Sequence, residues 1–201
     1  MKANFAQMIL VHEQTVFTTR EAAERCHTSL ASASRGLALL TKRGLLTHVM
    51  KSVWAKTSDK TFSAHQVIPH LNHKHQFYLS FTSALSLHGV LSQLPQRVTV
   101  ASTAHSGMVK TPVGVFEIHQ LAPELFQGFD WDSAHQYLLA TPEKALVDCL
   151  YLSFRKKKQF GYFPEIDMSL LNQKNIMKWI NLIRDQRTKS LVKAKLKELL
   201  V

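Results

Sequence analysis

Cysteine is scarce in this chain, whose 201 residues include only Cys26 and Cys149. Both fall in predicted helices and form no spaced framework, which argues against a disulfide scaffold and a cysteine-based metal site. We expect both side chains to be buried thiols in a reducing cytoplasm.

Long apolar runs are also missing. No stretch approaches the roughly 18 apolar residues that a membrane-spanning helix requires. The N-terminal segment MKANFAQMILVHEQ is interrupted by polar residues and is too short for a signal or an anchor. The sequence therefore predicts a cytoplasmic protein that does not use a membrane.

Acidic residues are few relative to basic ones. The chain has 25 Lys and Arg against 14 Asp and Glu, a net charge of +11, which indicates a polyanionic partner or an acidic protein. The net charge is +5 over residues 1–60 (nine basic, four acidic), −1 over 61–140 (three, four) and +7 over 141–201 (thirteen, six). Both ends of the chain are therefore basic, and the middle is not.

Recognisable catalytic motifs are absent from the sequence. There is no P-loop, GxGxxG, HExxH or CxxC, and no serine stands in a GxSxG elbow. Ser80 and His88 are more than two turns apart on one predicted helix, too far for a direct hydrogen bond. Glu143 and Asp148 do not share a helix face, so we assign them to capping and packing. We expect neither enzymatic activity nor a cofactor.

A strong pattern of local signals runs from residue 17 to residue 57. Thr18 and Glu21 have the spacing of a capping box, which predicts a helix over residues 19–26 that follows Phe17. A hydroxyl at Thr28 or Ser29 would cap a second helix over residues 30–42. Gly44 then supplies the left-handed residue that ends it.

The segments around these two helices complete the pattern. Residues 4–14 fit a first helix, and residues 45–49 and 53–57 read as two strands around a tip at residues 50–52. This order predicts an N-terminal winged helix-turn-helix over residues 1–60.

The predicted second helix has two unlike faces. Leu30, Ala33, Leu37 and Leu40 share one side, whereas the other side is small, hydroxylic and basic, which suits a major groove. Recognition helices contact bases with their N-terminal residues, and only Arg35 there could bind guanine through two hydrogen bonds. The residues predicted to contact DNA are Thr18, Thr28, Ser29, Ala31, Ser32, Arg35, Lys42, Arg43 and, in the wing, Lys51.

The polar segment over residues 61–76 predicts a linker between this domain and a second one over residues 77–201. Its four histidines, at 65, 70, 73 and 75, suggest zinc. We nevertheless expect no metal site, because the segment offers no cysteine, no acidic neighbour and no histidine pair spaced i, i+4.

The second domain is predicted to be a small sheet packed with helices, which makes the whole chain α+β. Its strands are expected at 97–102, 113–119 and 137–140, and its helices at 80–88, from Pro142, at 170–186 and at 190–200. A basic run closes the helix from Pro142: Arg155, Lys156, Lys157 and Lys158. This second basic surface could contact flanking phosphates, pair protomers on adjacent DNA repeats, or face an acidic partner.

Several segments of the chain occur in an order that resembles AbiEi-type regulators, the antitoxins of AbiE-like type IV toxin–antitoxin systems of abortive infection. The resemblance covers about residues 5–155. It rests on three segments besides the predicted winged helix: Tyr78-Leu79-Ser80-x-x-Ser83-Ala84-Leu85-x-x-His88-Gly89, Arg97-Val98-Thr99-Val100, and Ala140-Thr141-Pro142-Glu143-Lys144-Ala145-Leu146-x-Asp148.

This resemblance implies a protein that binds double-stranded DNA at promoter repeats, represses its own operon and counters a nucleotidyltransferase-type toxin. It leaves open whether antitoxin and toxin touch. The His-rich segment over residues 61–76 departs from the family pattern. Two alternatives also stay open: a stand-alone winged-helix regulator whose second domain binds a ligand or another protomer, and an enzyme that modifies a toxin or a nucleotide.

Overall fold

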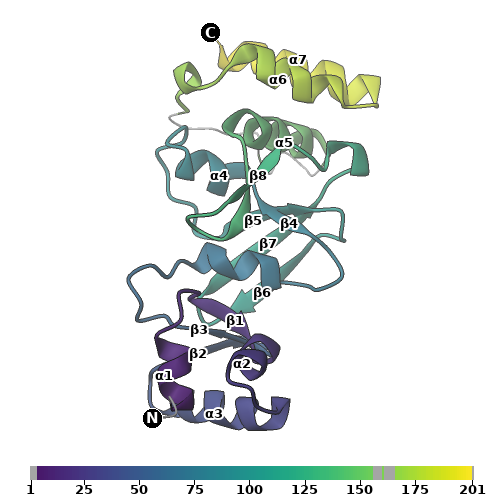
Figure 1. The fold of residues 1–201 in the computed structure, drawn as a ribbon. Coiled ribbons are helices and arrows are strands. Elements are labelled where there is room, and N and C mark those ends of the chain that lie inside the picture. Colours follow the sequence, from purple (N-terminus) through teal and green to yellow (C-terminus); the bar gives the residue numbers. More distant parts are fainter. Residues whose placement is uncertain (1–3, 156–159, 161–165, 201) are drawn as a thin grey trace. The chain divides into compact units, whose positions relative to one another are not determined.

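The structure is a computed structural model that describes residues 4–155, 160 and 166–200 (Figure 1). The chain is a mixed α+β protein that divides into two units. The first unit comprises Met1–His70 with Lys110–Gly114, and the second comprises Leu71–Val109 with Val115–Val201.

The first unit contains three helices and a three-stranded antiparallel sheet with strand order β1-β3-β2. In chain order its elements are α1 (Phe5–Leu10), β1 (Val16–Thr18), α2 (Thr19–Arg25), α3 (Leu30–Lys42), β2 (Thr47–Met50), β3 (Val53–Ala55) and the 3-10 helix η1 (Ala64–His70). The expected bounds of α3 are confirmed, and α2 ends one residue earlier than expected.

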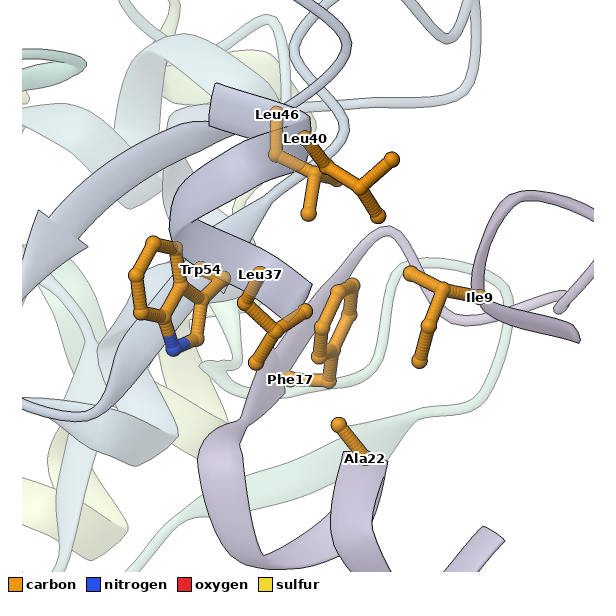
Figure 2. Packing of buried hydrophobic residues seen from close by; sticks show 7 residues of the cluster. All are labelled: Ile9, Phe17, Ala22, Leu37, Leu40, Leu46 and Trp54. Carbon is orange, nitrogen blue, oxygen red and sulfur yellow. The ribbon is translucent and has the colours of Figure 1, made fainter. Parts of the chain in front are cut away.

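Apolar residues from the helices and strands of this unit form one core, which Figure 2 shows from close by. The cluster consists of Ile9, Phe17, Ala22, Leu37, Leu40, Leu46 and Trp54. Leu30 was expected on the buried side of α3, but it lies outside this cluster. It is the first residue of α3 and is 53% exposed. The buried side of α3 is made by Ala33, Leu37 and Leu40.

The segment predicted as a linker contains η1, which belongs to the first unit. Val67 and Ile68 are fully buried, and the Gln66 side-chain oxygen accepts a hydrogen bond from Thr15 Oγ1 at 2.6 Å. Two buried aliphatic residues and a buried polar contact give this segment a packing role in the first unit, as the apolar Val67 and Ile68 suggest.

The second unit holds most of a six-stranded sheet with strand order β6-β7-β5-β4-β9-β8. The strands are β4 (Phe77–Leu79), β5 (Val98–Ser102), β6 (Gly107–Thr111), β7 (Gly114–Gln120), β8 (Phe129–Asp132) and β9 (Tyr137–Ala140). The β4–β5 and β8–β9 pairs are antiparallel, whereas β4–β9 and β5–β7 are parallel.

Helices of the second unit pack in layers on this sheet (Figure 1). They are α4 (Phe81–Leu87), α5 (Pro142–Arg155), α6 (Gln173–Asn181) and α7 (Gln186–Leu199), with short 3-10 helices η2 (Pro123–Leu125) and η3 (Met168–Leu170). Helix α4 packs on β5 and α5, and α6 and α7 pack on α5. Every residue of α5 from Glu143 to Ser153 is buried, as expected of a helix with neighbours on all sides.

Three helices of the chain end in the same hydrogen-bonded motif. Behind α3, Gly44 has φ +73°, its N–H donates to the Thr41 carbonyl, and the N–H of the next residue reaches Leu40. Gly89 after α4 and His27 after α2 also have positive φ. In each case the residue and its successor donate the same pair of backbone hydrogen bonds to the last turn of the helix. This Schellman arrangement confirms that Gly44 ends α3 in the left-handed conformation.

Gly128 occupies a place in the second unit where a side chain would press on its neighbours. Its φ is +81°, and an added Cβ would lie 2.8 Å from the Trp179 ring and 3.0 Å from Lys144 Cγ. Both of these side chains are buried. We predict that Gly128→Ala lowers the free energy of unfolding by about 2–4 kcal/mol, because left-handed strain adds to overpacking.

Gly89→Ala is the matched control, because Gly89 has φ +72° in the same unit and an added Cβ would meet nothing within 4 Å. It should cost only the backbone strain, about 1 kcal/mol. Denaturant unfolding of both variants measures the difference. Equal losses would show that the contact with Trp179 has no energetic weight.

Candidate nucleic-acid interface

Helices α2 and α3 are joined by a short turn whose geometry is fixed by hydrogen bonds. The Thr18 hydroxyl accepts from the Glu21 N–H, and Glu21 Oε2 accepts from the Thr18 N–H at 2.6 Å, so the predicted capping box is present. Ser29 caps α3, because its hydroxyl oxygen accepts from the Ser32 N–H at 3.2 Å. Between the two helices, His27 takes the left-handed conformation with φ +47°.

One stripe of α3 lies opposite its buried side. Ala31, Arg35, Ala38 and Lys42 follow one another at spacings of four, three and four residues, and all four are exposed. The two alanines keep the stripe shallow, and the two cations add positive charge to it. A surface of this form fits a groove whose walls are phosphates and whose floor is base edges.

The other residues predicted to contact DNA fall into two groups, those with exposed side chains and those whose side chains already form hydrogen bonds within the protein. Arg43 follows α3 and is exposed, as is Lys51. Thr18 is half-buried and its hydroxyl also donates to Glu21 Oε2, so the capping box occupies it.

The hydroxyls at the start of α3 are engaged as well. The Ser29 hydroxyl donates to Ser32 Oγ at 3.0 Å, although Ser29 itself is exposed. Thr28 and Ser32 are half-buried. The structure therefore brings Ala31, Arg35 and Lys42 together on an open face and leaves the hydroxyl residues at its margin.

The hairpin of β2 and β3 is joined to the start of α2 by the pairing of β1 with β3 and by two hydrogen bonds of Thr19. The Thr19 N–H donates to the Ser52 carbonyl at 2.9 Å, and Thr19 Oγ1 accepts from Trp54 Nε1 at 2.8 Å. Ser52 itself has φ +62° at the tip, next to exposed Lys51. These contacts fix the hairpin relative to α2, which the sequence patterns did not indicate.

Arg20 was missed as a candidate. It is exposed in the first turn of α2 and lines an open hollow of about 570 Å³ that also borders Thr28, Ser29 and Leu30 at the start of α3. Arginine is a common phosphate contact, and Arg20 lies two residues after the predicted contact Thr18, which could have suggested it.

A buried polar cluster in the second unit was also missed. The Asp148 carboxylate accepts hydrogen bonds from Tyr78 Oη at 2.9 Å, from Ser80 Oγ at 2.8 Å and from the Lys144 ammonium. Lys144 Nζ also donates to Tyr78 Oη at 3.0 Å. Ser80 occupies the N-cap position of α4 but makes no side-chain cap bond, because its hydroxyl points to Asp148 instead.

Burial dominates the electrostatics of this cluster. Loss of water lowers the pKa of Lys144 and raises the pKa of Asp148, and the opposite charge of each partner counteracts the shift. Burial, followed by the neighbouring carboxylate, raises the pKa of Tyr78 well above its ordinary value. Since all four side chains are fully buried, the cluster connects β4 to α5 and offers no open surface to a substrate.

Further findings concern metal sites, membrane-spanning helices and similarity to known proteins. Among the described residues, no group of three or more His, Cys, Asp or Glu could hold a metal ion. No helix in the described parts of the chain is long and apolar enough to cross a membrane. Comparisons with protein-family profiles and with curated proteins find no match.

The run expected as a second basic surface falls mostly outside the described residues. Arg155 is the last residue of α5, and Lys156, Lys157 and Lys158 lie outside the described ranges.

The Lys144–Asp148 pair generates a stability prediction. Lys144→Met leaves a buried carboxylate without its cation, which should lower the free energy of unfolding by about 3–5 kcal/mol. Lys144→Met combined with Asp148→Leu removes both charges and should recover most of that loss. Urea unfolding of wild type and both variants measures this. A double variant as unstable as the single one would show that the charge pair is not the cause.

Proposed function

We propose that the chain is a DNA-binding transcriptional repressor whose first unit is a winged helix-turn-helix. The observation that carries this proposal is the open stripe of Ala31, Arg35, Ala38 and Lys42 on α3. In this proposal, α3 enters the major groove, and the β2–β3 hairpin is the wing that reaches phosphates through Lys51. The order α1-β1-α2-α3-β2-β3 supports it.

Charge in the first unit supports the same partner. Arg20, Arg35, Lys42, Arg43 and Lys51 are all exposed. The net charge of +5 over residues 1–60 would attract a polyanion over a long range. Glu21 lies near the proposed interface but is held by the capping box.

For the second unit, we propose the antitoxin role of a type IV system, directed against a nucleotidyltransferase-type toxin. The support is the resemblance to AbiEi-type regulators. Four residues of its motifs, Tyr78, Ser80, Lys144 and Asp148, form the buried cluster. Motif residues that share one structural cluster are consistent with a common fold, which is why we give this role preference over a stand-alone regulator.

We also propose that the protein is not an enzyme. The polar cluster of Tyr78, Ser80, Lys144 and Asp148 is buried, and its hydrogen bonds are internal. A packing role explains these residues without a substrate.

Co-expression tests the antitoxin role. The neighbouring gene product, where it is a nucleotidyltransferase-type protein, is expressed from an inducible promoter with and without the full chain. The proposal expects growth arrest to be relieved by wild type. Growth arrest that persists at matched protein levels would favour the stand-alone regulator.

Arg35 generates a prediction about sequence reading. Arg35→Ala should weaken binding to the duplex upstream of the gene by about 1–3 kcal/mol and relax base preference at one position per half-site. Arg35→Lys retains the charge but not the paired hydrogen bonds, so it should lose base preference as well. Gel-shift titrations against single-base variants of the site measure both effects.

Lys51→Ala is the control for a phosphate contact. It should weaken binding to all duplexes about equally and reduce the slope of log K against log salt by about one unit. Base preference that survives Arg35→Ala, together with an unchanged slope for Lys51→Ala, would contradict the proposed docking of α3 and the wing.

A further inference from the structure

The last two helices of the second unit expose a basic surface that neither α3 nor the wing uses. Helices α6 and α7 lie side by side and pack on α5 (Figure 1). Ile176 and Ile180 of α6 and Val192 and Leu196 of α7 are buried in this packing, whereas Leu191 of α7 is exposed. The exposed positions of the two helices include the cations Lys174, Lys178, Arg187 and Lys197.

The acidic side chains of this region are already engaged. Asp185 caps α7 by accepting from the Thr188 N–H at 2.7 Å, Glu198 pairs with Lys195 at 2.6 Å, and Asp167 accepts from Ser169. By contrast, the cations of this region that form no ion pair within the described residues include Lys174, Arg187, Lys193 and Lys197.

Three of these cations are distributed along α7. Lys193 and Lys197 are one turn apart, and Arg187 lies near the start of the helix. The helical rise spreads Arg187 and Lys197 over about 15 Å. A DNA duplex presents about nine phosphates over that length, at one charge per roughly 1.7 Å.

We propose that α7, with Lys174 of α6, forms a second surface that binds the phosphates of duplex DNA. This inference rests on the proposed DNA-binding function. Protein interfaces are depleted of lysine and centre on buried aromatic or apolar anchors. This surface presents cations beside small residues such as Ser190 and Ala194, and Leu191 is the large apolar residue exposed on α7. A membrane surface would require the apolar side of α7, which is packed on the unit. Helix α7 would therefore raise the affinity for DNA without adding sequence specificity, because phosphate contacts do not distinguish one base from another.

The test uses the full chain and a triple substitution on α7, Arg187→Gln, Lys193→Gln and Lys197→Gln. The matched control neutralises three other exposed lysines, Lys60→Gln, Lys74→Gln and Lys110→Gln, and so removes the same net charge. Fluorescence anisotropy measures binding to the upstream duplex and to a random duplex of equal length between 50 and 200 mM salt. Circular dichroism confirms that each variant is folded.

The α7 variant should bind both duplexes at least 10-fold more weakly at low salt, with a log–log salt slope reduced by about two to three units. The affinity ratio between the duplexes should stay unchanged, in contrast to Arg35→Ala. A second variant on both helices, Lys174→Gln with Lys197→Gln, should reduce the slope by about two units.

The outcomes separate a failure of the proposed DNA-binding function from a failure of the second surface alone. A wild-type chain that binds neither duplex would overturn the proposed function and this inference with it. A chain that binds DNA, but whose α7 variant behaves like the control variant, would overturn only the second surface. An α7 variant that keeps DNA affinity and fails only in the growth-rescue assay would assign this surface to an acidic protein and would likewise overturn the inference.

Discussion

The candidate DNA-binding surface depends on how β1 and Thr19 hold the β2–β3 hairpin beside α2. The Thr19 amide binds the tip of the hairpin at Ser52, and its hydroxyl accepts the indole N–H of buried Trp54. The same residue begins α2 directly behind the capping threonine, Thr18. Together with the pairing of β1 and β3, these bonds place the end of the hairpin beside the start of α2. A hairpin held in this way presents Lys51 with less conformational entropy to lose on binding a ligand.

The second unit depends on a different constraint, the enclosure of α5. A helix buried on every side leaves no solvent for its polar residues, so Lys144 and Asp148 must satisfy one another and the hydroxyls of Tyr78 and Ser80. This requirement selects one way of laying α5 on the sheet, because Tyr78 on β4 and Ser80 at the start of α4 lie two residues apart in the chain. Helices α6 and α7 then cover the outer side of α5, which leaves their cations facing outward. The packing of α6 and α7 on α5 thus determines which of their charged side chains are exposed.

Local signals in the sequence predicted much of the fold, and contacts between distant residues decided the rest. The bounds of α3 and β9 and the role of Gly44 follow from capping, alternation and glycine geometry, which act within a few residues. Strand β1 was missed because three residues carry no period, and it exists through pairing with β3, 35 or more residues later. Asp185 was read inside one long helix, whereas it caps α7 and separates it from α6. Among the candidate site residues, Arg35 and Lys42 are exposed as expected. The capping role of Thr18 was predicted from its spacing to Glu21. The bond of Ser80 to Asp148 could not be foreseen, because it joins residues 68 positions apart that only the tertiary structure brings together.

Hydrogen exchange of the full chain, with and without a saturating upstream duplex, tests the winged-helix assignment most directly. Docking of α3 and the wing predicts added protection in peptides that cover the first turns of α3 and the hairpin tip around Lys51, the two parts that would lose water on binding. Complete DNA binding with no added protection in either segment would contradict it, because the duplex would then be held by some other part of the chain.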